Sequence, residues 1–173
     1  PEIFPKHLKM VTIQSLPTLP RGGVIMEMEN GECAVTLVGV NKDYAPTDEA
    51  GFLEFAKSLA SPAIYEIIQQ AEPISKINGY QRTENRWQHY ERMVRWPDGL
   101  IVLGDAACAF NPVYGQGMTT GALAAEALGK LLAEYQSKPT DGMAKAYQKR
   151  LAKVIQTPWL MATGEDLRYP GTV

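Results

Sequence analysis

The sequence predicts a mixed fold with an α+β part followed by an α/β part, and two observations carry this prediction. Asn30-Gly31 stands between two β-prone runs, which is a strong signal for a β-hairpin, and two short helical patterns follow it. Further along, the apolar run 100–103 is typical of a buried strand, and a helical pattern begins near residue 117. We therefore divide the 173-residue chain into residues 1–82 and 83–173.

Length and composition limit the class of protein. A chain of 173 residues is about one domain, and its net charge of −2 gives no electrostatic basis for binding nucleic acid. No apolar run approaches the length of a membrane span, and the N-terminus lacks the layout of a signal peptide. The two cysteines are far apart and have no metal-ligand spacing, which fits a reducing compartment. We expect a cytoplasmic protein with no metal site, no nucleic-acid partner and no integral membrane association.

The first part of the chain predicts a small sheet. Residues 9–15 predict a short strand, and residues 24–29 and 33–40 predict two more strands joined by a two-residue turn. In that register one face of the hairpin is fully apolar, with the pairs Met28 and Cys33, Met26 and Val35, and Val24 and Leu37. Such a face covers either an ordinary core or a ligand cavity.

Two short helices are predicted after the hairpin. Thr47 or Asp48 caps a helix that runs to about residue 59, and Ser61-Pro62 opens a second helix that runs to about residue 71. Residues 75–82 then predict a strand that leads into the second part.

The second part begins with a polar and aromatic stretch at residues 85–92. Basic and aromatic side chains alternate there, but Glu84 and Glu91 lie among them, so a packed connector with surface ion pairs is favoured over a nucleic-acid site. His89 has no His or Cys partner at metal spacing and is predicted to be structural. Near the C-terminus, a new helix capped by Thr140 or Asp141 carries one apolar face: Met143, Tyr147, Leu151, Val154 and Ile155.

The predicted strand, loop and helix around residue 117 have the layout of an anion-binding site. The first N–H groups of a helix lack intrahelical partners and carry partial positive charge. Gly115 and Gly117 have no side chain, so negative atoms of a ligand can approach these amides. Asp105 follows the predicted strand, where an open α/β sheet binds its ligand, and a carboxylate there suits a ribose hydroxyl. The residues alone predict a nucleotide or another anion.

The order Gly104-Asp105-Ala106, Pro112 and 115–118 (Gly-Gln-Gly-Met), followed by a helix of small residues, resembles a known motif. It is the second FAD-binding motif of the single-component FAD-dependent monooxygenases, the aromatic hydroxylase and epoxidase group. The resemblance implies that Asp105 accepts a hydrogen bond from a ribitol or ribose hydroxyl of FAD. The predicted cofactor-binding residues are Gly104, Asp105, Pro112, Gly115, Gln116, Gly117, Met118 and Thr119. Residues 159–170 also resemble the closing segment of some family members.

The resemblance implies that this chain is the C-terminal portion of such an enzyme. Residues 83–173 would be a fragment of an FAD/NAD(P)-binding doubly wound domain, and residues 1–82 part of a layer of sheet and helices that covers the substrate. No Gly-x-Gly-x-x-Gly follows a strand here and the chain begins at Pro1, so we expect the pyrophosphate site in a missing N-terminal portion of the same protein.

The implied activity is insertion of one oxygen atom of O2 into a hydrophobic substrate, aromatic or alkene, with NAD(P)H as reductant. The fragment alone is expected to be inactive, and no residue is assigned a catalytic role. Cys108 near the helix N-terminus could be a reactive thiol, but its small apolar neighbours in the sequence favour an inert buried cysteine. Two alternatives stay open: a flavin dehydrogenase, reductase or halogenase on the same fold, and a non-enzymatic interaction module that retains part of the fold.

Overall fold

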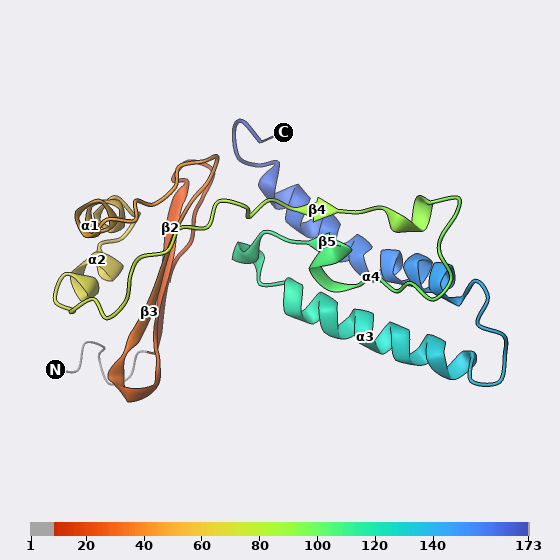
Figure 1. Cartoon of the computed structure of the whole chain (residues 1–173). Coiled ribbons are helices and arrows are strands. Elements are labelled where there is room, and N and C mark those ends of the chain that lie inside the picture. Colours follow the sequence, from red (N-terminus) through yellow and green to blue (C-terminus); the bar gives the residue numbers. More distant parts are fainter. Residues whose placement is uncertain (1–8, 173) are drawn as a thin grey trace. The chain divides into compact units, whose positions relative to one another are not determined.

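A computed structural model describes residues 9–172, which form two compact units. Unit 1 comprises residues 9–81 with residues 167–172, and unit 2 comprises residues 82–166. Both units combine helices with a small sheet, as Figure 1 shows. The predicted mixed α and β character is therefore confirmed.

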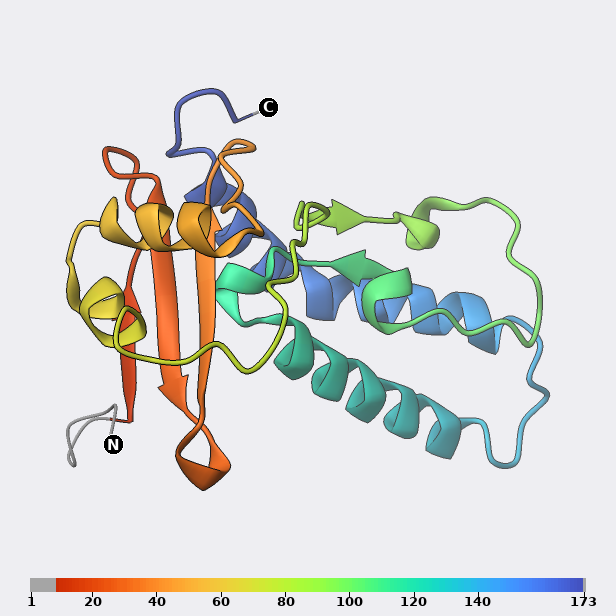
Figure 2. The same cartoon turned by 60° about the vertical axis from the view of Figure 1, so that its left-hand side comes forward.

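Unit 1 is an antiparallel three-stranded sheet with two helices on one face. The strands are β1 (Met10–Ile13), β2 (Arg21–Glu27) and β3 (Cys33–Gly39), in the order β1-β2-β3. Helices α1 (Glu49–Lys57) and α2 (Ala63–Ile68) follow, as Figure 2 shows from a second side. Asp48 caps α1 as predicted, because its Oδ1 accepts a 2.8 Å hydrogen bond from Gly51 N. The core of unit 1 consists of Ile13, Ile25, Phe55, Leu59 and Ile64.

The predicted hairpin is present, but its register was wrong by one residue. Met28 N donates to Glu32 O at 2.7 Å, so the loop holds three residues, 29–31, instead of two. Asn30 and Gly31 have the left-handed backbone that their sequence predicts, with φ of 63° and 76°. The additional loop residue moves each β2 partner by one position, and side chains alternate between the faces of a strand. The inward pairs are consequently Glu27 with Cys33, Ile25 with Val35, and Gly23 with Leu37.

Residues 75–82 do not form the predicted strand. They are irregular, and most of them are exposed. Ile77 is half-buried, whereas Tyr80 is 84% exposed, so the segment has little apolar surface to bury against a neighbouring strand. A segment that buries so little apolar surface is not stabilised as a strand.

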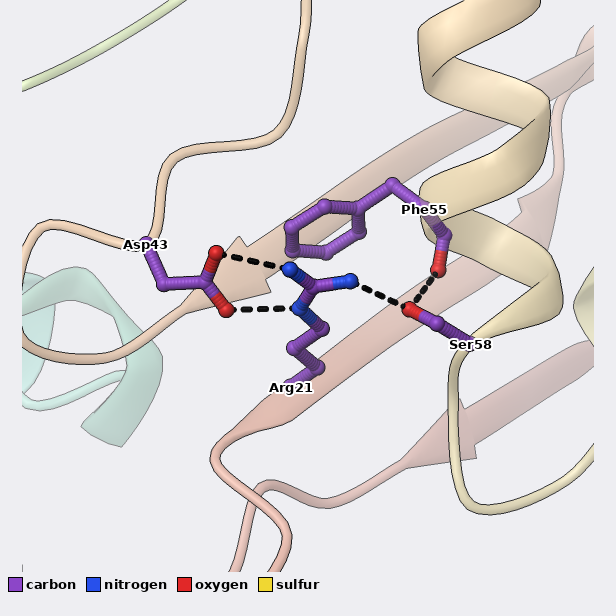
Figure 3. A network of polar contacts seen from close by, with 4 residues as sticks. All are labelled: Arg21, Asp43, Phe55 and Ser58. Atoms are coloured by element: carbon purple, nitrogen blue, oxygen red, sulfur yellow. Dashed lines mark hydrogen bonds and ion pairs between the residues drawn. The ribbon is translucent and has the colours of Figure 1, made fainter.

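Arg21 connects three parts of unit 1, as Figure 3 shows. Its Nε and Nη2 donate to the two carboxylate oxygens of Asp43 at 2.6 and 2.8 Å, and its Nη1 donates to Ser58 Oγ at 2.7 Å. The guanidinium also lies 4.3 Å from the centre of the Phe55 ring. The hydrogen bond from Arg21 holds the pKa of Asp43 below its usual value. The start of β2, the turn after β3 and the end of α1 are thereby tied together.

Replacing Asp43 by asparagine is expected to destabilise unit 1 more at neutral pH than in acid. The folded pKa of Asp43 is lowered, so its stabilisation is complete above the unfolded pKa of about 4 and is lost as the pH falls through the folded pKa. Both side chains are about one-third exposed, at 36% and 35%, and solvent screening therefore limits the loss to about 1 kcal/mol. Urea denaturation at pH 7 and pH 3 measures this loss in the free energy of unfolding, with Glu29→Gln at the hairpin loop as control. An equal loss at both pH values would contradict the explanation.

Unit 2 is built on two long helices, α3 (Gly117–Glu134) and α4 (Met143–Asp166). They pack together around an apolar core of Ala107, Cys108, Ala124, Leu131, Tyr147, Leu151 and Ile155. Both helices were predicted, and the predicted inward face of α4 is confirmed at Tyr147, Leu151 and Ile155. The sequence did not predict the short antiparallel pair of β4 (Arg86–Trp87) and β5 (Cys108–Ala109).

The predicted strand at residues 100–103 is not present. The segment is irregular, and within residues 9–172 no strand pairs with it. Side chains bind two of its carbonyl groups instead: Gln148 Nε2 donates to Val102 O at 3.0 Å, and Trp96 Nε1 donates to Leu100 O at 2.8 Å. An apolar run becomes a strand only beside a second strand that supplies the ladder of hydrogen bonds. Gln148 is 3% exposed, and this bond explains its burial.

Candidate functional site

The glycine-rich segment folds as a series of short turns that ends at α3. A 3₁₀ turn spans Gly104–Ala106, β5 follows, and a second 3₁₀ turn spans Pro112–Tyr114. The side chain of Asn111 caps the second turn by accepting a 3.2 Å hydrogen bond from Val113 N. Gly115 then adopts a left-handed conformation with φ of 65°, which glycine does without steric cost. This sharp change of direction starts α3 two residues later.

A small pocket lies at the N-terminal end of α3. It is lined by Gly104, Asp105, Cys108, Gly117, Thr120, Gly121, Ala124, Leu151 and Ile155. Three of the predicted site residues therefore come together from two separate elements: Gly104 and Asp105 from the first 3₁₀ turn and Gly117 from α3. Sequence reasoning missed Thr120 and Gly121. Helical spacing from Gly117 was the signal that could have found them, because residues three and four positions apart share one face of a helix.

The other five predicted residues do not line this pocket. Pro112 and Gly115 lie in and directly after the second 3₁₀ turn, and both are exposed. Met118 is 90% exposed and Thr119 is exposed in the first turn of α3. The side-chain oxygen Oε1 of Gln116 is buried without a hydrogen-bond partner among the described residues. Their predicted contact with a flavin stays a prediction.

The N-terminus of α3 fits a ligand with negative or hydrogen-bond-accepting atoms. Within residues 9–172 no side chain caps this end of the helix, although a helix has orphan N–H groups in its first turn. A Cβ atom built at Gly104, Gly117 or Gly121 would meet no atom within 4 Å, so the space beside the backbone is open. The side-chain oxygen of Gln116, the residue before α3, is buried and accepts no hydrogen bond from the described residues. Carbonyl or phosphate oxygens of a ligand suit such N–H donors.

Cys108 is part of the pocket wall but not a nucleophile. Its side chain is 4% exposed, and burial together with the carboxylate of Asp105 raises the pKa of the thiol to about 12. The thiol is therefore protonated at neutral pH, which agrees with the predicted inert role.

His89 has the structural partners that its sequence context suggests. Its Nδ1 lies 2.7 Å from Glu91 Oε1, and its ring lies against that of Trp87, with 4.3 Å between the ring centres.

In the described part of the chain, no three His, Cys, Asp or Glu side chains gather as possible metal ligands. None of the helices described there is both long and apolar enough to cross a membrane.

The fold and the pocket define a mixed α/β protein whose glycine-rich helix N-terminus and nearby aspartate suit a nucleotide cofactor. The family described as "FAD binding domain" matches residues 6–158, and the chain belongs to this family. This membership supports FAD as the cofactor and an oxidoreductase flavoprotein as the class.

A curated relative is "Protein Rv3254" of Mycobacterium tuberculosis (strain ATCC 25618 / H37Rv). It is 28% identical over 141 residues, which cover 82% of this chain and 30% of the relative. The chain thus spans about a third of the length of the relative it matches.

Proposed function

We propose that this chain is the C-terminal portion of an FAD-dependent monooxygenase that inserts one oxygen atom of O2 into a hydrophobic or aromatic substrate. The observation that carries the proposal is the pocket in which Gly104, Asp105 and the N-terminus of α3 meet, in a chain of the FAD-binding family. NAD(P)H is the proposed reductant, following the resemblance of residues 104–121 to the monooxygenase motif.

Each pocket residue has a proposed task in holding the cofactor. Asp105 would accept a hydrogen bond from a ribitol or ribose hydroxyl, and the amides at the start of α3 would bind the pyrimidine part of the flavin. When bound, FAD supplies the redox chemistry that activates O2. The N-terminus of α3 would place the positive end of its dipole beside the bound cofactor. Leu151 and Ile155, both buried, exclude water from the inner wall of the pocket.

We further propose that an N-terminal portion of the same protein completes a doubly wound domain around unit 2. Two apolar segments of unit 2 support this proposal. On α3, exposed apolar or small residues recur at spacings of four and three: Met118, Ala122, Ala125, Gly129 and Leu132. Such spacing is typical of a face that packs on another helix. The apolar residues 100–103 also have no strand beside them within residues 9–172, and a parallel sheet would supply one.

The sheet of unit 1 is the proposed substrate cover. Helices α1 and α2 pack on the face that holds Ile13 and Ile25. The corrected register places a different set on the opposite face, where Met10, Met26 and Ala34 pair in one row and Thr12, Val24 and Thr36 in the next. Five of these six are exposed and Val24 is half-buried. An exposed face with methionine and small side chains suits contact with an apolar or aromatic substrate.

A titration with FAD tests the proposal. The 173-residue chain and the longer gene product that we propose to contain it would be titrated while flavin fluorescence is followed, each beside an Asp105→Ala variant. We expect the variant to bind at least about tenfold more weakly, because a charged hydrogen-bond acceptor is removed. Binding by neither protein would overturn the flavin proposal in favour of the interaction module.

A second assay separates monooxygenase from reductase chemistry. The flavin-loaded protein would be given NAD(P)H and ¹⁸O2 with a panel of aromatic and alkene compounds. Incorporation of one labelled oxygen into a product supports the proposal. Consumption of NAD(P)H without label in any product would favour the dehydrogenase or reductase alternative.

A further inference from the structure

A hydrogen-bond network in unit 2 converges on the carboxylate of Asp166, the last residue of α4. Asn85 Nδ2 donates to Asp166 Oδ2 at 2.5 Å, and the hydroxyl of Tyr114 donates to Asp166 Oδ1. Asn85 in turn accepts a 2.8 Å hydrogen bond from Asn111 N on its Oδ1. The network joins residues that are 81 and 52 positions apart in the sequence.

The network holds both ends of the turn that precedes α3. Asn111 caps the 3₁₀ turn Pro112–Tyr114 from its N-terminal side, and Tyr114 is its last residue. Gly115 follows at once, with its N–H bonded to Pro112 O at 3.0 Å, and α3 begins at Gly117. The outer side of the turn has little packing, because Pro112 and Val113 are exposed. The anchors of this turn are therefore polar and come from Asn85 and Asp166.

Asp166 is poorly placed for the stability of its own helix. The C-terminal end of a helix carries partial negative charge, so a carboxylate there is unfavourable. No basic residue stands in the last turn of α4 to offset it. The two donors that meet the carboxylate, from Asn85 and Tyr114, compensate for this position. The hydrogen bonds of the Asp166 carboxylate therefore stabilise the turn at residues 111–115, whereas its charge does not stabilise α4.

We propose that Asp166 and Asn85 are positioning residues for the flavin site, which set the direction of the α3 N-terminus by fixing the turn at residues 111–115. This inference rests on the proposed function for the identity of the ligand. The geometric part of it, that the two side chains order the turn, stands on the hydrogen bonds alone. Neither residue touches the pocket itself, which other residues line.

The donor and acceptor pattern allows a sharp test by exchange of the two side chains. Asp166 must accept two hydrogen bonds, whereas Asn85 donates one and accepts one. Asp166→Asn places an amide where two donors meet, and Asn85→Asp places two carboxylates together, so each single variant breaks the network. In the double variant the amide at position 166 donates to the carboxylate at position 85. The remaining oxygens still accept from Tyr114 and from Asn111 N, so the full pattern returns.

The first measurement is amide hydrogen exchange of the 173-residue chain without flavin. We expect each single variant to speed exchange at residues 111–119 by about tenfold, and the double variant to restore the wild-type rate. Asp141→Asn is the matched control, since it makes the same chemical change at an exposed residue just before α4. Wild-type exchange in a folded single variant, or a double variant no slower than the worse single one, would overturn the inference.

The second measurement is the dissociation constant for FAD, in whichever of the two titrated proteins binds it. We expect about tenfold weaker binding in each single variant, with recovery in the double variant. A purely structural role would lower the melting temperature without this pattern in affinity, so faster exchange with unchanged affinity would overturn the positioning role. If wild-type protein binds no flavin, the proposed function fails, and the exchange data still decide whether Asp166 and Asn85 order the turn.

Discussion

Replacing Gly39 by alanine is expected to cost unit 1 at least about 3 kcal/mol of its free energy of unfolding. A Cβ atom built at Gly39 would lie 1.7 Å from the carbonyl oxygen of Asp43. The turn that causes this contact is tight, because Asn41 and Lys42 both have a left-handed backbone, with φ of 57° and 68°. The added methyl group must push Asp43 away, which also breaks its bonds with Arg21. Urea denaturation followed by circular dichroism measures the loss.

The matched control is Gly79→Ala in the same unit. The nearest neighbour of a Cβ at Gly79 is a side-chain methyl group of Thr47 at 3.2 Å, which can move aside. We expect this variant to stay within about 0.5 kcal/mol of the wild type. Similar denaturation curves for the two variants would show that the turn at residues 39–43 is pliable and that the predicted clash is relieved by a small shift.

Replacing Gly117 by aspartate is expected to weaken FAD binding by at least about 30-fold while leaving the fold intact. Gly117 lies at the edge of the pocket, and a Cβ there meets no atom within 4 Å, so a side chain can be added without disturbing the core. A carboxylate in the first turn of a helix favours the helix, because it meets the positive end of the dipole. The same carboxylate repels a ligand that approaches with negative atoms. Stability and affinity should therefore change in opposite directions.

Ser137→Asp provides the control for this experiment. It adds the same charge at an exposed position beyond the other end of α3, and a helix of 18 residues spans about 27 Å. The control is expected to bind FAD like the wild type in fluorescence titration, and thermal melting of both variants monitors the fold. Undiminished binding by Gly117→Asp would place the flavin away from the N-terminus of α3.

Much of the secondary structure and part of the candidate site could be predicted from residues that are neighbours in the chain. Asp48 caps α1, Asn30-Gly31 makes the hairpin turn, and the 3.6-residue periodicity predicts α3 and the inner face of α4. Gly115 takes the left-handed backbone just before α3. In these cases a few adjacent side chains and backbone torsions determine the conformation, so no distant partner is needed.

Tertiary contacts decided the features that depend on distant residues. One more residue in the loop at 29–31 turned Met26 and Val24 to the open face, because side-chain direction alternates along a strand. The apolar run 100–103 is not a strand within the described chain, because a strand requires a partner that local sequence does not supply. The sequence by itself thus determined the helices, the hairpin turn and the glycine-rich N-terminus of α3. Only the tertiary structure brought Leu151 and Ile155 to the pocket and Asp166 to Asn85 and Tyr114, since these contacts form when α3 and α4 pack together and their loops meet.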